Sequence, residues 1–415
     1  MAALKSVPFT AHSKAAHLLA GIFFCCIFFL YQVYPQENRQ LFELWSHNTF
    51  PAANDIPLLK NVVFKSIKKY EPATDDYRFL HGVAIVNDKG KWMVSFGHNK
   101  GPENTGSEEA NSMISFNNGK SWSGLIPIDN PPGDLATSHG VFLNHRDTLW
   151  SFNGAFTRIM EDVHTRAFIW NEQDSKWIFK GVVARSGFWP LQEPVLMDNG
   201  HWIMAGAAIT DNNTPPAVAI CSDDTFMNWE VKQIPVSYKV WGESSIIVNG
   251  ADILLVARSG ANTPKFHALH PLAWVSVSHD FGNTWSELQP SNMPMAASKP
   301  YAGILSNGQR YLIGSSASDI GNRRSPLTIA VSKPNEDRFS KIFCIRRSAV
   351  SDPSVESNVN VALAYPYAVE YKKHLWVVYS NNGGDVGRAG QQGRASWNNN
   401  SAELAIIPIA DLSIE

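Results

Sequence analysis

A segment of strand, polar turn and strand recurs six times along the chain, and this repetition limits the possible folds more than any other feature of the sequence. In each copy a short apolar run leads into a turn rich in Gly, Asn, Asp or Lys, and a second apolar run follows, which is typical of a β-hairpin. A spacing of 50 to 65 residues between copies holds four strands and their loops, the size of one propeller blade. The sequence therefore predicts an all-β, six-bladed β-propeller, with seven blades as the alternative. The copies begin at His81, His139, Glu193, Glu243, Pro300 and Tyr365.

The two ends of the repeat region indicate how the ring closes. The C-terminal segment SAELAIIPIADLSI reads as a late strand of the last blade, and NVVFKSI at 61–67 reads as a strand that completes that blade. Pairing between them would leave no exposed sheet edge. The predicted propeller domain therefore spans residues 61–415.

A turn motif accompanies the repeats. Ser278 to Trp285 reads SHDFGNTW, which matches the Asp-box pattern SxDxGxTW, and Ser115 to Trp122 is a close copy with Asn for Asp. Ser222 to Trp229 is a degraded third copy. The Asp or Asn side chain bonds local backbone and Gly takes the positive φ angle, so the expected role is structural. Together with the repeats, these boxes resemble those of the sialidase superfamily, over nearly the whole region that follows the N-terminal segment.

The N-terminal region carries an apolar run, LLAGIFFCCIFFLYQV, over residues 18–33, near the lower length limit for crossing a bilayer. Lys5 and Lys14 precede it, which favours a cytoplasmic N-terminus. We therefore expect a tail over 1–17, a transmembrane signal-anchor over 18–34, a linker over 35–60, and a propeller on the extracytoplasmic side of the membrane. A cleaved signal peptide is the alternative, although bulky residues occupy the place of a small-residue cleavage site.

Composition excludes several other classes. With 35 Lys and Arg against 37 Asp and Glu, and no basic stripe, nucleic acid is not an expected partner. Only Cys221 and Cys344 lie outside the apolar run, so a disulfide framework is excluded. No CxxC or HExxH motif occurs, and the sequence indicates neither a metal nor a cofactor.

The innermost strand of each propeller blade begins near the central axis, so residues at these starts are expected to converge on one pocket. In this chain they are unusually polar. They are Arg78, His81, His139, Glu193, Glu243, Lys299, Tyr301, Tyr365 and Tyr367.

The sialidase resemblance implies roles for some of these residues. The expected substrate is a glycan with a terminal acidic sugar, whose carboxylate is held by three arginines. A tyrosine deprotonated by a glutamate attacks the anomeric carbon, and a separate carboxylic acid protonates the leaving oxygen. By resemblance, Glu243 is the base, Tyr365 the nucleophile with Tyr367 as the alternative, and the arginines are Arg78, Arg258 and Arg324, with Arg323 as the alternative to Arg324.

The first blade departs from the family pattern. The proline expected after Arg78 is missing, and the general-acid aspartate expected before the first Asp box has no clear counterpart. Glu103 or Glu108 in GPENTGSEEA is the candidate substitute.

The same region is rich in histidine, with His81, His98 and His139. This arrangement resembles propeller lyases that act on uronic acids, in which an arginine neutralises the uronate and His or Tyr removes the C5 proton. Arg158 is the candidate neutraliser. A third hypothesis is a glycan-binding propeller without catalysis. All three hypotheses expect aromatic side chains at the rim of the pocket, and the candidates are Phe188, Trp189 and Trp241. Sialidase-like hydrolysis is the preferred hypothesis.

Overall fold

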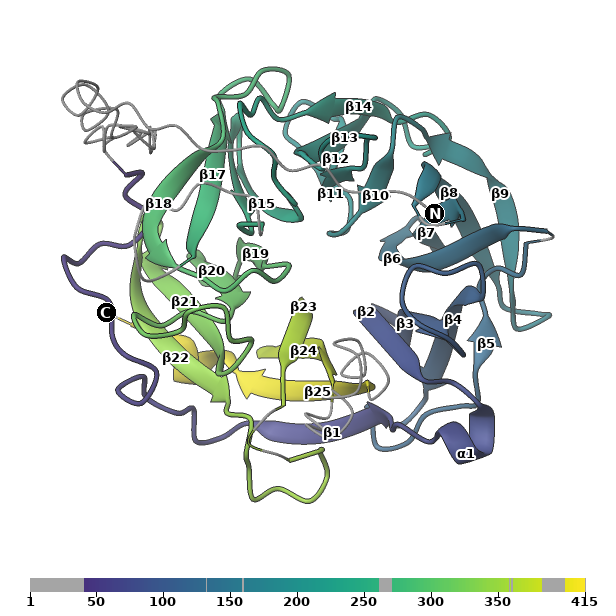
Figure 1. Cartoon of the computed structure of the whole chain (residues 1–415), viewed down its shortest axis with the longest axis horizontal. Coiled ribbons are helices and arrows are strands. Elements are labelled where there is room, and N and C mark those ends of the chain that lie inside the picture. The colour runs from purple at the N-terminus through teal and green to yellow at the C-terminus, as the bar shows by residue number, and fades with distance from the viewer. Residues whose placement is uncertain are drawn as a thin grey trace, which may run out of the picture. The chain divides into compact units, whose positions relative to one another are not determined.

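Six antiparallel sheets follow one another around a ring, and each forms one blade (Figure 1). The computed structural model describes residues 41–131, 133–158, 160–260, 271–357, 359, 361–382 and 400–414. The prediction of a six-bladed propeller is confirmed, and the seven-bladed alternative is wrong. The expected transmembrane segment at 18–34 lies outside the described residues. Within the described part of the chain, no helix has the length and apolar character that a membrane span requires.

Each predicted repeat supplies the inner strands of one blade. The strands of the first three blades are β2 (Phe79–Asp88), β3 (Lys91–Asn99), β4 (Glu108–Ser115), β5 (Ile126–Pro127); β6 (Leu135–His145), β7 (Thr148–Thr157), β8 (Glu161–Asn171), β9 (Lys176–Ala184); and β10 (Phe188–Pro190), β11 (Val195–Leu196), β12 (Trp202–Ala208), β13 (Pro216–Cys221), β14 (Glu230–Gln233). In the third blade β10 and β11 both pair with β12, so two short strands replace the single inner strand.

The fourth and fifth blades are regular four-stranded meanders. Their strands, with those of the sixth blade, are β15 (Ser244–Asn249), β16 (Asp252–Ala257), β17 (Leu272–Ser278), β18 (Gln289–Pro294); β19 (Tyr301–Ile304), β20 (Gln309–Gly314), β21 (Leu327–Pro334), β22 (Phe339–Arg346); and β23 (Leu363–Tyr371), β24 (His374–Asn381), β25 (Ser401–Pro408). The described helices are short: α1 (Pro72–Asp75) and the 3-10 turn η2 (Ile409–Leu412).

The sixth blade joins the two ends of the propeller. β1 (Val63–Lys68) pairs antiparallel with β25, with Val63 opposite Ile406 and Ser66 opposite Glu403. The order β23-β24-β25-β1 therefore places the N-terminal strand outermost. The predicted closing strand at 61–67 is confirmed, and it removes the open edge that β25 would otherwise present.

Part of the predicted linker is packed against the propeller. Phe42 bridges to Ser291 of β18, and Trp45 and Leu58 bridge to β22. The side chain of Asn292 also accepts hydrogen bonds from the backbone nitrogens of residues 44 and 45. We call residues 41–60 the strap. It belongs to the same compact unit as the blades.

The Asp boxes form the expected turns between the third and fourth strands of their blades. The Asp280 carboxylate accepts hydrogen bonds from the backbone nitrogen and the hydroxyl of Thr284, and Gly282 has a φ of 78°. Asn117 accepts the corresponding backbone bond in the first blade. The boxes therefore stabilise blade turns.

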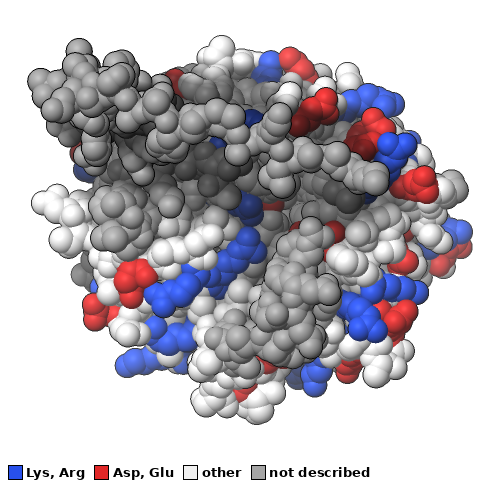
Figure 2. All heavy atoms as spheres, viewed as in Figure 1, with Lys and Arg blue, Asp and Glu red and all other residues white. Residues whose placement is uncertain are grey.

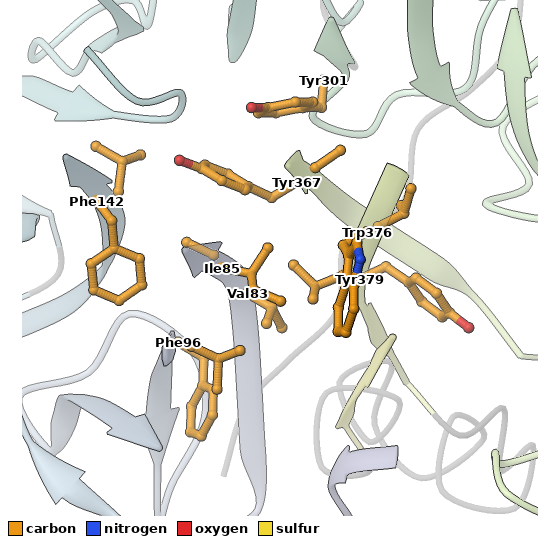
Figure 3. Close-up of a cluster of buried hydrophobic side chains, with 14 of the residues drawn as sticks. Val83, Ile85, Phe96, Phe142, Tyr301, Tyr367, Trp376 and Tyr379 are labelled. Carbon is orange, nitrogen blue, oxygen red and sulfur yellow. The ribbon is translucent and has the colours of Figure 1, made fainter. Parts of the chain in front are cut away.

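Side chains fill the middle of the ring. Figure 3 shows Tyr301 of β19 and Tyr367 of β23 lying near one another, with Val83 and Ile85 of β2 on the other side of Tyr367. The ring centroids of the two tyrosines are 4.7 Å apart. The middle of the propeller is therefore a packed core at this level of the axis.

Candidate active site

A cavity of about 930 Å³ is lined by residues from all six blades and from the strap. Its charged residues are Glu103, Glu243, Arg258, Asp319, Arg323, Arg324 and Arg347. Its aromatic and imidazole side chains are Phe79, His81, His139, Trp189, Trp241 and Tyr365. A concave site with a few convergent polar groups is the usual form of a small-ligand or sugar site.

Three inner strands have an irregular register where they meet the cavity. The irregularities lie between His81 and Ala84 in β2, between Thr137 and Gly140 in β6, and between Ala364 and Tyr367 in β23. A β-bulge redirects the side chains next to it. In each case a ring, that of His81, His139 or Tyr365, lines the cavity beside the bulge.

The local backbone explains why glycine stands next to His81. Gly82 has a φ of 65°, and a Cβ atom there would lie 2.1 Å from Cγ of His139. Tyr365 has a positive φ of 56° although it is not glycine. Such a conformation costs about 1–3 kcal/mol and is found where the surroundings hold it in place.

Tyr365, Glu243 and Arg258 form one hydrogen-bonded cluster. The Tyr365 hydroxyl donates a hydrogen bond to Oε1 of Glu243, and Nη1 of Arg258 lies 2.7 Å from Oε2 of the same carboxylate. Nη1 of Arg258 also donates to the Tyr365 hydroxyl oxygen at 3.2 Å. Trp241 donates its indole N–H to Oε1 of Glu243 at 3.2 Å. A buried carboxylate thus faces a phenol and a guanidinium at once.

The surroundings set the resting protonation of this cluster. Burial alone raises the pKa of Glu243, but the Arg258 charge and the Tyr365 hydrogen bond bring that pKa below its usual value. Burial and the negative charge of Glu243 raise the pKa of Tyr365 well above its usual value. The proton therefore rests on Tyr365, and the Glu243 carboxylate is placed to accept it.

Arg324 and Glu103 complete the charged lining near the tyrosine. The Arg324 guanidinium lies 5.8 Å from the centre of the Tyr365 ring, and its Nη2 donates to the carbonyl oxygen of Ala297 at 3.0 Å. Glu103 lies in the loop between β3 and β4. Burial, with the nearby charges of Glu108 and Glu243, raises the pKa of Glu103 to about 7. A carboxyl group with that pKa is partly protonated at neutral pH, as a general acid must be.

The histidines of the cavity are neutral. Burial lowers the pKa of His139 to about 4, and burial with nearby positive charges lowers that of His81 well below its usual value. The His81 ring centroid lies 3.7 Å from that of Tyr365.

Three residues predicted to face the pocket lie in the layer below it. Tyr301 donates its hydroxyl to the Glu193 carboxylate at 2.6 Å, and burial raises the pKa of Glu193. Tyr301 is 1% exposed and Tyr367 is 2% exposed. Neither these tyrosines nor Glu193 is part of the cavity lining. The prediction that they face the pocket is wrong, because the axis there is filled by packed side chains.

Lys299, which was also predicted to face the pocket, lies outside the cavity lining and joins that lower layer to β23, the strand that carries Tyr365. Its Nζ donates to the carbonyl oxygens of Pro366 at 2.9 Å and Leu191 at 3.2 Å. Burial lowers the pKa of Lys299 to about 8. Because Pro366 follows Tyr365, this ammonium group fixes the backbone next to the tyrosine.

The structure also places Arg78, His98 and Arg158 away from the cavity. Arg78 is exposed just before β2, so the inner strand carries His81 into the site instead. His98 is buried on β3 with its ring stacked 3.6 Å from that of Tyr77. Arg158 has a 74% exposed side chain that pairs with Glu161 at 3.2 Å.

Glu108 and Phe188 are also outside the lining. The Glu108 carboxylate accepts hydrogen bonds from the Asn104 backbone and the Ser138 hydroxyl, and Phe188 is fully buried. Of the aromatic residues predicted at the rim of the pocket, Trp189 and Trp241 line the cavity.

The sequence reasoning missed Arg347, which lines the cavity immediately after β22. That position follows an outermost strand, where the hairpin pattern gives no reason to expect a pocket residue. The pair Arg346 and Arg347 was the only available signal.

Comparison with known proteins agrees with this architecture. Residues 173–377 match the model of the BNR repeat-like domain. The match covers just under half of the chain, which has the six-bladed propeller fold that solved sialidases also have. No curated protein matches its sequence.

Three solved structures illustrate the range of proteins that share this fold. A Dyadobacter fermentans protein of unknown function has a TM-score of 0.60 and 16% identity, covering 84% of this chain and all of that one. A variant of the NanB sialidase of Streptococcus pneumoniae has a TM-score of 0.60 and 11% identity, covering 84% of this chain and 71% of that one. A Penicillium chrysogenum α-L-arabinanase complexed with arabinobiose has a TM-score of 0.56 and 15% identity, covering 85% of this chain and 99% of that one. At these identities the likeness shows the fold.

Proposed function

We propose that the protein is a glycoside hydrolase that releases a terminal acidic sugar from glycans. The observation that carries this proposal is the hydrogen-bonded cluster of Tyr365, Glu243 and Arg258 beside Arg324 in one cavity. Two guanidinium groups beside the tyrosine suit a carboxylate ligand, because planar guanidinium pairs with carboxylate in fixed geometry.

In the proposed reaction Tyr365 is the nucleophile. Its hydroxyl proton passes to Glu243 as the phenolic oxygen bonds to the anomeric carbon, and the glycosidic bond breaks. Glu103 gives its proton to the leaving oxygen. A neutral nucleophile suits a substrate whose carboxylate lies next to the anomeric carbon, because a carboxylate nucleophile would be repelled by it.

The second step reverses these proton movements. Glu103, now ionised, takes a proton from water as the water oxygen bonds to the anomeric carbon. The bond to Tyr365 breaks, and the phenolic oxygen recovers its proton from Glu243. The protein returns to its starting state with one sugar released and one water consumed.

Comparison with solved propellers supports hydrolysis in general. Sialidases and arabinan-degrading enzymes share the fold, although the fold alone does not determine function. The arginines near Tyr365 favour an acidic sugar over an uncharged arabinose unit.

Uronate elimination is the second candidate, and one observation favours it. His81 and His139 both line the cavity, with their ring centroids 3.7 Å and 6.0 Å from that of Tyr365. Because Arg158 is remote, Arg258 or Arg324 would have to neutralise the uronate.

Product mass distinguishes the candidates. The full chain and its Tyr365→Phe variant are incubated with sialylated glycans and with uronate-rich polysaccharides. A released sugar acid that contains one added water, absent with the variant, supports the proposal. An unsaturated uronate without added water supports elimination instead, and binding without any product supports a glycan-binding propeller.

A further inference from the structure

Four arginines among the described residues line the cavity, one more than the three that the sialidase resemblance implies for a single carboxylate. Arg323 and Arg324 lie in the segment between β20 and β21, and Arg347 follows β22 of the same blade; all three line the cavity. We call these three residues the arginine wall. Figure 2 shows Lys and Arg side chains in a line that runs from the outer part of the blade formed by β19–β22 toward the centre of this face.

Within the described part of the chain, little negative charge compensates the arginine wall. The recorded bonds of Arg324 and Arg347 go to backbone carbonyl oxygens: that of Ala297 for Arg324, and those of Ala53 and Ile56 in the strap for Arg347. Neither guanidinium lies within 4.0 Å of a carboxylate among these residues. Arg323 is 3.8 Å from the Asp319 carboxylate, and its side chain is 66% exposed.

The proposed function gives a role to only some of the arginines that line the cavity. Arg258 already faces the Glu243 carboxylate, and Arg258 and Arg324 together flank Tyr365. Arg323 and Arg347 have no part in the proposed chemistry. The cavity volume of about 930 Å³ lies at the upper end of the usual range of about 300–1,000 Å³ for ligand sites. There is therefore room beyond a single sugar ring.

We propose that the arginine wall binds a second anionic group of the substrate, carried by the sugar next to the one released. The substrate class is then a glycan with two neighbouring acidic units, in which the second unit carries a carboxylate or a sulfate ester. Arg324 faces the tyrosine and Arg323 faces the second unit. This inference rests on the proposed hydrolysis of an acidic sugar.

The test compares matched disaccharides with the full chain. One substrate has an uncharged second unit, one has a carboxylate there, and one has a sulfate. We expect kcat/KM of the wild type to be about 10-fold higher for a doubly acidic substrate at low ionic strength, and this preference should shrink when salt screens the charges. Arg323→Gln should reduce the preference about 3-fold, because it should lower kcat/KM more for the doubly acidic substrates than for the singly acidic one. The carboxylate and sulfate arms identify which anion the wall prefers.

Arg146→Gln is the matched control, because Arg146 is 74% exposed and pairs with Asp224 outside the cavity. It should leave the preference unchanged. Equal rates of the wild type on all three substrates, or an unchanged preference in Arg323→Gln, would overturn the inference while leaving the hydrolysis intact. If no substrate is cleaved, the proposed function fails. Calorimetric binding of the same disaccharides then decides the inference: tighter binding of the doubly acidic ones that is weakened in Arg323→Gln supports it, and equal binding overturns it.

Discussion

The Tyr365 hydroxyl donates a hydrogen bond to Glu243, which lies 122 positions earlier in the chain. Tyr365 comes from the inner strand of the sixth blade and Glu243 from the start of the inner strand of the fourth. Their contact spans the cavity beside the fifth blade, so the relative position of the proposed base and the proposed nucleophile depends on the packing of the whole ring. Substitutions within this cluster are expected to change chemistry more than stability.

Arg258→Lys should lower kcat/KM for an acidic sugar about 10- to 100-fold, because one guanidinium contacts both the Glu243 carboxylate and the Tyr365 hydroxyl. Lysine keeps the positive charge but lacks the planar guanidinium group, which pairs with a carboxylate in fixed geometry. Thermal unfolding of the variant should resemble that of the wild type. An unchanged kcat/KM would remove Arg258 from the site.

The pH profile of kcat/KM should have an acid optimum. Glu243 must be ionised, and because its pKa is lowered, activity is retained until the pH falls below the usual range for a glutamate. Glu103 must be protonated, so activity should decline as the pH rises through about 7. In Glu103→Gln the alkaline decline should disappear, with the loss of rate smallest for substrates that have good leaving groups. If the alkaline decline persists in this variant, a group other than Glu103 causes it.

Lys299→Met should lower kcat up to about 100-fold with little change in KM, because the ammonium group holds the Pro366 carbonyl next to Tyr365. Gln192→Met is the matched control. Gln192 is also buried and also bonds to backbone carbonyl oxygens, those of Ile246 and Ala302, but not to β23, the strand that carries Tyr365. Both variants should lose stability. If both also lose kcat equally, Lys299 has only a structural role.

Arg346→Met should destabilise the fold by about 3–5 kcal/mol, since it leaves the fully buried Glu403 carboxylate without its cation. Arg346 belongs to β22 and Glu403 to β25, so this ion pair connects the fifth and sixth blades. The double variant Arg346→Met with Glu403→Leu should recover part of the loss in urea unfolding experiments. A single variant as stable as the wild type would show that the pair adds nothing.

The repeats and the closing strand could be predicted from the sequence because hairpin pattern and turn chemistry are local. The convergence of Tyr365 and Glu243 followed from the position of inner-strand starts near the axis, whereas Arg258 was predicted only by the resemblance to sialidases. Local pattern does not reveal register, however. The irregularity after His81 turns that ring into the cavity, whereas Arg78 precedes the strand and stays exposed.

The repeats also could not predict how deep a residue lies along the propeller axis, or which residues enter the cavity from connections between blades. Tyr301 and Glu193 have the same placement at a strand start as Glu243, but they meet across the axis and become buried. Arg347 enters the cavity from a connection between blades, a part of the propeller that the repeats do not describe.

The pairing of β1 with β25 also has a consequence for biosynthesis. β1 leaves the ribosome well before its partner, which is among the last segments of the chain to be made. Until β25 appears, β1 has no neighbour in its own blade, and the sixth blade that packs against β2 is incomplete. The five finished blades must therefore wait while β1 and β24 present unpaired edges, a state that is prone to association between chains. Ring closure is then a late, long-range step, and a chain that stops before β25 is expected to be a substrate for chaperones or proteases rather than a partly active propeller.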